Sequence, residues 1–197
     1  MLYGIAWVLL KIYFFIFFRF KTYGREHVPK SGGVIFCANH SSMMDPVILA
    51  MITRRRIHYV AKVELFESRF VAAAFKSLGA FPVDRNKTDM AAYKHAIDLL
   101  KQGRAVGVFA QGARYKEFDA KDAKAGVALF ALKSGAAVVP VAIKTPYKLF
   151  SRIVVNVGPP VDLGDYINKR VKSEMLNEVT EKIMAEVVRL MDGAGGR

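Results

Sequence analysis

A histidine and an aspartate lie five residues apart in the segment "CANHSSMMDP", residues 37–46. An apolar run precedes His40, and Pro46 follows Asp45. Because proline is favoured at the start of a helix, Asp45 or Ser42 is a candidate N-cap. We therefore expect a turn between a strand and a helix to bring His40 and Asp45 together. In such a pair the carboxylate holds one ring nitrogen and leaves the other free to accept a proton.

The alternative for this pair is purely structural. His40 would then satisfy the end of a strand, and Asp45 would only cap the following helix. The predicted strands and helices around the pair, and the other motifs in the sequence, distinguish these two interpretations.

Short apolar segments alternate with amphipathic ones along most of the chain. The strand candidates are rich in β-branched residues, as is typical of strands covered on both faces; they are residues 34–38, 57–61, 80–84, 105–110, 137–143 and 152–157. Helical spacing of apolar residues is clearest over 88–102, with Thr88 as the expected cap, and over 165–192. The sequence therefore predicts a single α/β domain, residues 23–197, with a mostly parallel sheet flanked by helices. His40 would follow a strand's carboxyl end, where functional sites gather in such sheets.

The first 20 residues are strongly apolar and are interrupted only by Lys11 and Arg19. A helix needs about 20 residues to cross a bilayer, so the length permits a span. No basic residue precedes Lys11 and no small-residue cleavage site follows, which favours a retained anchor over a signal peptide. We expect residues 1–22 to form a hydrophobic, membrane-associated helix, with an irregular linker after it. It would span the membrane or lie in one leaflet; the alternative is a buried core helix of a soluble protein.

Composition restricts the class of partner. The chain is 53% hydrophobic, which excludes disorder, and its formal net charge is +13. Such a charge suits a solvated basic surface, a nucleic-acid binder or a protein on anionic lipid. No nucleic-acid-binding module is recognisable, so no nucleic acid is expected. Cys37 is the single cysteine, and histidines and carboxylates do not cluster at metal-ligand spacing, so no disulfide and no metal are expected.

Further segments resemble a known family in order and spacing. "NHSSMMDP" resembles the Asn-His-x4-Asp motif of the glycerolipid acyltransferases, in particular the short bacterial 1-acylglycerol-3-phosphate acyltransferases. The other blocks that resemble the family are "YVAKVELF" (59–66), "GAFPVDR" (79–85), "VFAQGARY" (108–115) and "AVVPVAI" (137–143). The resemblance covers nearly the whole chain.

The resemblance implies a reaction. An acyl chain would pass from acyl-CoA or acyl-carrier protein to the free hydroxyl of 1-acyl-glycerol-3-phosphate, a lysophosphatidate, giving phosphatidate. His40 would be the general base, and Asp45 would fix its tautomer and stabilise the imidazolium. A thioester is already activated, which agrees with the absence of a Gly-x-Ser-x-Gly nucleophile motif. No cofactor is expected beyond the donor, which is a substrate. The enzyme would work at the cell membrane, with its active domain on the cytoplasmic side.

The resemblance also implies groups that bind the substrate. Arg85 and Arg114 match family arginines and would bind the phosphate with bidentate geometry. Lys62 matches the family lysine, and Gly112 would let backbone approach the ligand. Gln111 could hydrogen-bond a glycerol hydroxyl or an arginine, without adding charge. Each cation could equally be one of the 30 basic side chains on the surface.

The third block departs from the family pattern. Ala110, Gln111 and Ala113 stand where the family usually has proline, glutamate and threonine. This departure keeps two alternatives open. The protein could be a non-catalytic, membrane-associated lipid-binding relative, or an acyltransferase that acts on a different lysolipid.

Overall fold

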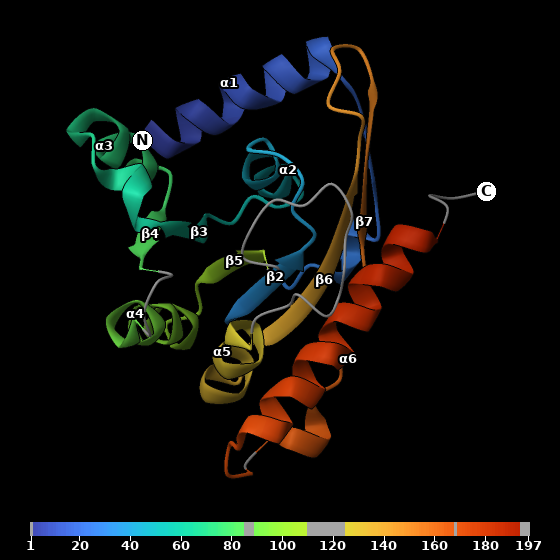
Figure 1. The fold of residues 1–197 in the computed structure, drawn as a ribbon. Helices are drawn as coiled ribbons and strands as arrows, with labels where there is room; N and C mark the ends of the chain where they lie inside the picture. The colour runs from blue at the N-terminus through green and yellow to red at the C-terminus, as the bar shows by residue number, and fades with distance from the viewer. Residues whose placement is uncertain (1, 85–88, 110–124, 168, 194–197) are drawn as a thin grey trace.

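The computed structural model describes residues 2–84, 89–109, 125–167 and 169–193. Within these residues seven strands form one sheet in the order β1-β7-β6-β2-β5-β3-β4 (Figure 1). The strands are β1 (Arg19–Tyr23), β2 (Val34–Ala38), β3 (Ile57–Lys62), β4 (Ala80–Val83), β5 (Ala105–Phe109), β6 (Ala137–Lys144) and β7 (Arg152–Val157). Neighbouring strands run parallel except β6 and β7, which are antiparallel.

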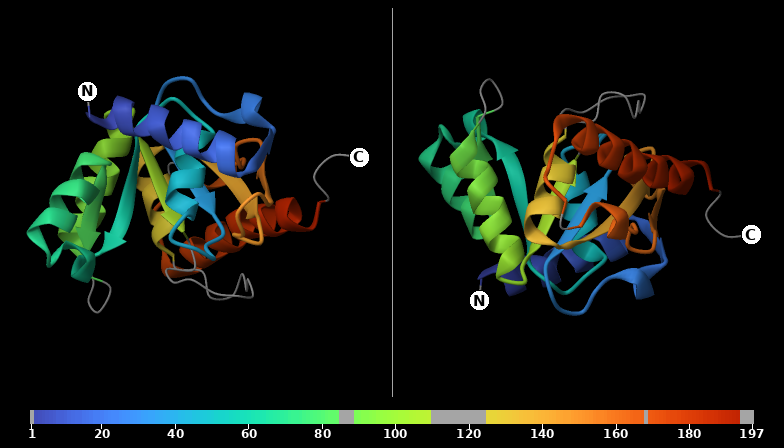
Figure 2. Two further views of the ribbon diagram at one scale, coloured as in Figure 1. Left: turned by 90° about the horizontal axis from the view of Figure 1, so that it is seen from above. Right: turned by 90° about the horizontal axis from the view of Figure 1, so that it is seen from below.

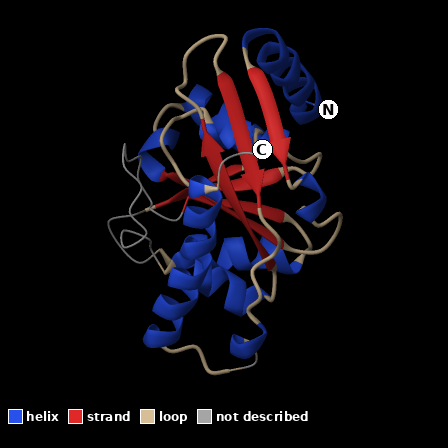
Figure 3. Ribbon diagram, turned by 90° about the vertical axis from the view of Figure 1, so that its right-hand side faces the viewer, coloured by secondary structure: helices blue, strands red, loops and turns tan. Residues whose placement is uncertain are grey.

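Helices lie on both sides of this sheet (Figure 3). They are α1 (Leu2–Phe17), α2 (Asp45–Met51), α3 (Arg69–Ser77), α4 (Met90–Lys101), α5 (Gly126–Ser134) and α6 (Ser173–Asp192). Seen from above, α1 lies across the outside of the layer that also contains α2 (Figure 2, left). The fold is thus the predicted α/β domain with a mostly parallel sheet.

The central strand β2 divides the core in two. All of its residues are buried, and successive side chains point to opposite faces because a strand has a period of two. Val34, Phe36 and Ala38 pack in the cluster that includes residues of α1 and α2. Ile35 and Cys37 pack in the cluster formed with α4, α5 and α6. The segment that carries the His–Asp motif therefore leaves the middle of the molecule.

Six predicted strands are confirmed within the described residues, but three expectations about other segments were wrong. Residues 19–23, expected as the end of the anchor and the start of a linker, form β1 and pair with β7. The boundary expected after residue 22 therefore falls inside a strand. The last helix begins at Ser173 and not near residue 165, because a separate 3-10 turn occupies Gly164–Tyr166. Asp89 caps α4 by accepting from Ala92 N at 3.0 Å, whereas Thr88 lies outside the described residues.

The N-terminal apolar segment is helical. Its helix, α1, has 16 residues. In the part of the chain that the structure describes, no helix combines the length and the apolar character needed to cross a bilayer.

Candidate functional site

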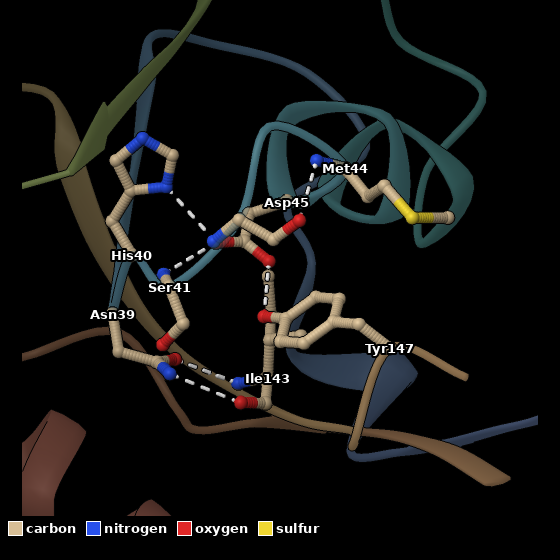
Figure 4. A network of polar contacts seen from close by, with 8 residues as sticks. Asn39, His40, Ser41, Met44, Asp45, Ile143 and Tyr147 are labelled. Atoms are coloured by element: carbon tan, nitrogen blue, oxygen red, sulfur yellow. Dashed lines mark hydrogen bonds and ion pairs between the residues drawn. The ribbon is translucent and has the colours of Figure 1, made fainter. Parts of the chain in front are cut away.

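The His–Asp pair lies in the turn between β2 and α2 (Figure 4). His40 Nδ1 is 2.9 Å from Asp45 Oδ2. A carboxylate only accepts hydrogen bonds, so Nδ1 carries the proton and donates it. The contact expected from the sequence is confirmed. The Asp45 side chain is fully buried, and the His40 side chain is 14% exposed.

Asp45 does not cap its helix as a side-chain acceptor. Met44 occupies the N-cap position, Asp45 is the first helical residue, and Pro46 follows it. The carboxylate turns back to the loop, where Oδ2 also accepts from Ser41 N at 2.7 Å and from Ser42 N at 2.8 Å. The expected N-cap role was therefore wrong. The loop that carries His40 is instead folded around the carboxylate.

Tyr147, from the connection between β6 and β7, completes the shell of donors. Its hydroxyl donates to Asp45 Oδ1 at 2.6 Å (Figure 4). Burial, followed by the hydrogen bond to Asp45 and the negative charge of Asp45, raises the pKa of Tyr147 well above its usual value. The phenol is therefore protonated and donating at neutral pH.

Asn39 sets the point where the chain leaves the sheet. The last residue pair between β2 and β6 is Ala38 and Val141. Beyond it, the Asn39 side chain donates to Ile143 O at 3.0 Å and accepts from Ile143 N at 2.7 Å. The amide thus replaces backbone pairing on β6. The backbone can turn outward at His40 while the buried polar groups stay paired.

Aromatic rings support the other side of the imidazole. The ring of Phe109, at the end of β5, stacks on His40 with centroids 4.2 Å apart. Tyr59, on β3, lies nearly parallel to Phe109 and donates to Pro46 O at 2.6 Å. Among the described residues, His40 Nε2 has no hydrogen-bond partner. The arrangement holds one ring nitrogen and leaves the other for a ligand.

Of the remaining predicted site residues, Lys62 is the one that the structure describes. Lys62 ends β3 with half of its side chain exposed, and its Nζ is 2.7 Å from Glu64 Oε1. Arg85, Gln111, Gly112 and Arg114 lie outside the described residues, so their roles stay predictions.

Several residues of the site were missed from the sequence, among them Asn39 and Tyr147. Asn39 precedes His40 in the motif, and its position at a strand end was an available signal. Tyr147 gave no local signal, because it lies 102 residues after the carboxylate that it contacts.

Comparisons with known proteins agree with this fold and motif. A family model described as acyltransferase matches residues 19–144. The 1-acyl-sn-glycerol-3-phosphate acyltransferase of Bacillus subtilis (strain 168) is 32% identical over 176 residues, which cover 86% of this chain and 87% of the relative. The protein of the same name from Streptococcus pneumoniae (strain ATCC BAA-255 / R6) is 32% identical over 163 residues, 79% of this chain and 60% of that relative.

A solved structure supports the fold. The crystal structure of the 1-acyl-sn-glycerophosphate (LPA) acyltransferase PlsC from Thermotoga maritima matches 99% of this chain and 78% of its own, with a TM-score of 0.66 at 24% identity. The family model covers more than half of the chain, and the Bacillus relative matches over most of both lengths. The chain therefore belongs to the acyltransferase family and is of the 1-acyl-sn-glycerol-3-phosphate acyltransferase type.

Proposed function

We propose that the protein transfers an acyl chain from the thioester of acyl-CoA or acyl-carrier protein to the free hydroxyl of 1-acyl-glycerol-3-phosphate, which gives phosphatidate. The observation that carries this proposal is the imidazole of His40, whose Nδ1 is held by a buried carboxylate while Nε2 is left without a partner in the described residues. Such a pair is suited to remove a proton from an alcohol.

The steps follow from this geometry. His40 Nε2 takes the proton of the acceptor hydroxyl as its oxygen bonds to the thioester carbonyl carbon. Asp45 stabilises the imidazolium that forms. When the tetrahedral intermediate collapses, the carbon–sulfur bond breaks, and the leaving thiolate takes the proton from His40. A positioned general base contributes a rate enhancement of about 10²–10⁴-fold, and proximity and oxyanion stabilisation contribute the rest of the rate enhancement.

The acceptor's phosphate needs fixed cations. We assign this role to Arg85 and Arg114, with Lys62 as a further positive charge near the phosphate. Gln111 would contact the glycerol part of the acceptor. At Gly112 the absence of a side chain would let the backbone approach the ligand. Lys62 is available for it, because an exposed pair such as Lys62–Glu64 contributes only about 0–1 kcal/mol and yields readily to a doubly charged phosphate.

Membrane association through α1 is the second part of the proposal. Among the α1 side chains that the structure describes, the exposed large apolar ones are Val8, Leu9, Ile12, Tyr13 and Ile16, whereas Phe14 and the adjacent Phe18 are buried in the core. A helix with one face on the protein and an apolar face outside suits a position in one leaflet, parallel to the membrane plane. The acyltransferase domain, beginning with β1, would then lie on the cytoplasmic side.

An assay with purified protein in mixed micelles tests the reaction. Acyl-CoA and acyl-carrier-protein donors are compared on lysophosphatidate and on an uncharged lysolipid. We expect His40→Ala to lower kcat/KM by at least about 100-fold. His95→Ala, an exposed histidine on α4, is the matched control and should behave as the unmodified protein. Full activity of His40→Ala would overturn the assignment of the base. If the unmodified protein acts on the uncharged lysolipid and not on lysophosphatidate, the assignment of lysophosphatidate as the acceptor is wrong.

A further inference from the structure

Tyr147 contributes the one hydrogen bond to Asp45 Oδ1 that comes from the described residues. The other three donors, His40 Nδ1 and the backbone N–H groups of Ser41 and Ser42, all meet Oδ2. The two carboxylate oxygens are thus held by different parts of the chain. Oδ2 is held by the local turn, and Oδ1 by a loop that is distant in sequence (Figure 4).

The backbone at Tyr147 indicates that this contact is not incidental. Its φ is +54°, in the left-handed region that side chains other than glycine seldom adopt. Thr145 Oγ1 accepts from Tyr147 N at 3.1 Å and holds the turn in this shape. Unfavourable backbone conformations persist only where the surroundings hold them, and they gather at functional sites.

We propose that Tyr147 is a positioning residue for the transfer reaction. It fixes Asp45 Oδ1, so that Oδ2 stays on His40 Nδ1 while the ring gains and loses a proton. Rotation about the carboxylate torsion of aspartate is soft, so three donors on one oxygen do not fix the plane of the group as firmly as donors on both. The inference rests on the proposed function, in which His40 is the base.

The mechanism also needs the right tautomer. With Oδ2 on Nδ1, the neutral ring carries its proton on Nδ1 and presents an unprotonated Nε2 to the acceptor hydroxyl. If the carboxylate turns, part of the His40 population carries its proton on Nε2 and cannot act as a base. Loss of the Tyr147 hydroxyl should therefore lower turnover and leave substrate binding almost unchanged.

Tyr147→Phe tests this inference because it removes only the phenol oxygen. We expect kcat to fall about tenfold or more, with KM for donor and acceptor within about twofold of the unmodified protein. Tyr166→Phe is the matched control. Tyr166 OH donates to Glu178 Oε1 at the same distance, 2.6 Å, but at an exposed position. This control should leave kcat and KM unchanged.

A spectroscopic readout separates positioning from a general loss of folding. Protein labelled with 15N-histidine reports which ring nitrogen of His40 carries the proton, with His40→Ala used to assign the signals. In Tyr147→Phe we expect a mixture of tautomers in place of the Nδ1–H form. Tyr166→Phe should keep the Nδ1–H form.

These measurements distinguish a failure of the role of Tyr147 from a failure of the proposed acyl-transfer reaction. A fall in kcat with an unchanged tautomer overturns the role of Tyr147, and so does a changed tautomer with unchanged kcat. If Tyr147→Phe behaves as the unmodified protein while His40→Ala is inactive, only this inference fails. If His40→Ala is fully active, the proposed function itself fails.

Discussion

Asp45 is a buried carboxylate surrounded by neutral hydrogen-bond donors. Within the described residues its partners are His40, two backbone N–H groups and the Tyr147 phenol, and no lysine or arginine pairs with it. A buried charge must be satisfied locally, and donors do this without cancelling the charge. The negative charge of Asp45 therefore remains available to stabilise an imidazolium at His40. A cation in the same place would compete with that role.

The single cysteine provides a prediction at the same scale. Burial raises the pKa of Cys37 to about 12, so at pH 8 only about one thiol in 10⁴ is ionised. Cys37 should therefore not carry the acyl group during transfer. We expect iodoacetamide to leave activity unchanged in the native protein and to alkylate Cys37 once urea unfolds it, as followed by mass spectrometry. An acyl adduct on Cys37 during turnover would show instead that the thiol is a covalent intermediate.

Strand β5 is shaped to let β3 support the start of α2. Tyr59 of β3 lies over Gly107 of β5, since a Cβ atom built on Gly107 would be 2.5 Å from Tyr59 Cε1. The Tyr59 hydroxyl then reaches Pro46 O, next to Asp45. The absence of a side chain in one strand thus gives room for a ring in the next. That ring fixes the start of the helix that begins with Asp45.

Gly107→Ala should disturb this chain of contacts. The added methyl group meets a ring whose far end is held by its hydrogen bond to Pro46, so the ring cannot simply swing away. We expect a loss of about 1–3 kcal/mol in the free energy of unfolding, measured in urea, together with a lower kcat. Gly126→Ala is the control, because nothing lies within 4 Å of a Cβ there and the residue begins α5. Equal stability of the two variants would show that Tyr59 adapts freely.

The sequence predicted the elements whose signal is local. The run 34–38 is apolar throughout, and the burial of all its residues agrees with that pattern. Strand β1, "RFKTY", was not predicted, because it directly follows the aromatic run of the N-terminal helix. Its pairing partner, which begins at Arg152, is also far away in the sequence. The start of the last helix was misplaced because Ile167 continues the apolar spacing, although it is 54% exposed.

The His40–Asp45 contact was predictable from one turn. The Tyr147 contact depends on how β6 and β7 place their connection.

Across the whole molecule, the apolar surface of α1 continues onto the connection between β6 and β7. Phe150 N donates to Phe17 O at 2.7 Å, and the two rings are 6.0 Å apart. Leu149 and Phe150 are exposed there, at 60% and 65%. The same connection carries Tyr147, which contacts Asp45. If α1 lies in a leaflet as proposed, the segment next to it links the membrane surface to the His–Asp pair.

Substituting the exposed face of α1 tests this arrangement. Leu9→Glu with Ile16→Glu places two charges at positions that are 61% and 57% exposed, so the fold should be retained. Burying a large aliphatic side chain contributes about 1.5–3 kcal/mol, so we expect binding to vesicles with anionic lipid to fall at least about 100-fold. kcat/KM should fall with vesicle-embedded lysophosphatidate and stay unchanged with a short-chain, water-soluble acceptor.

The matched control separates the apolar contribution from net charge. Met90→Glu with Ile167→Glu makes the same charge change at positions that are 66% and 54% exposed and lie away from α1. The formal net charge of +13 attracts the unmodified protein to anionic lipid, and two added glutamates lower it to +11 (13 − 2) in both double variants, so both reduce that attraction equally. If α1 enters the leaflet, only the α1 variant loses vesicle binding, and high salt does not release the unmodified protein. Equal losses in both variants, with release by salt, would show that the basic surface alone holds the protein on the membrane.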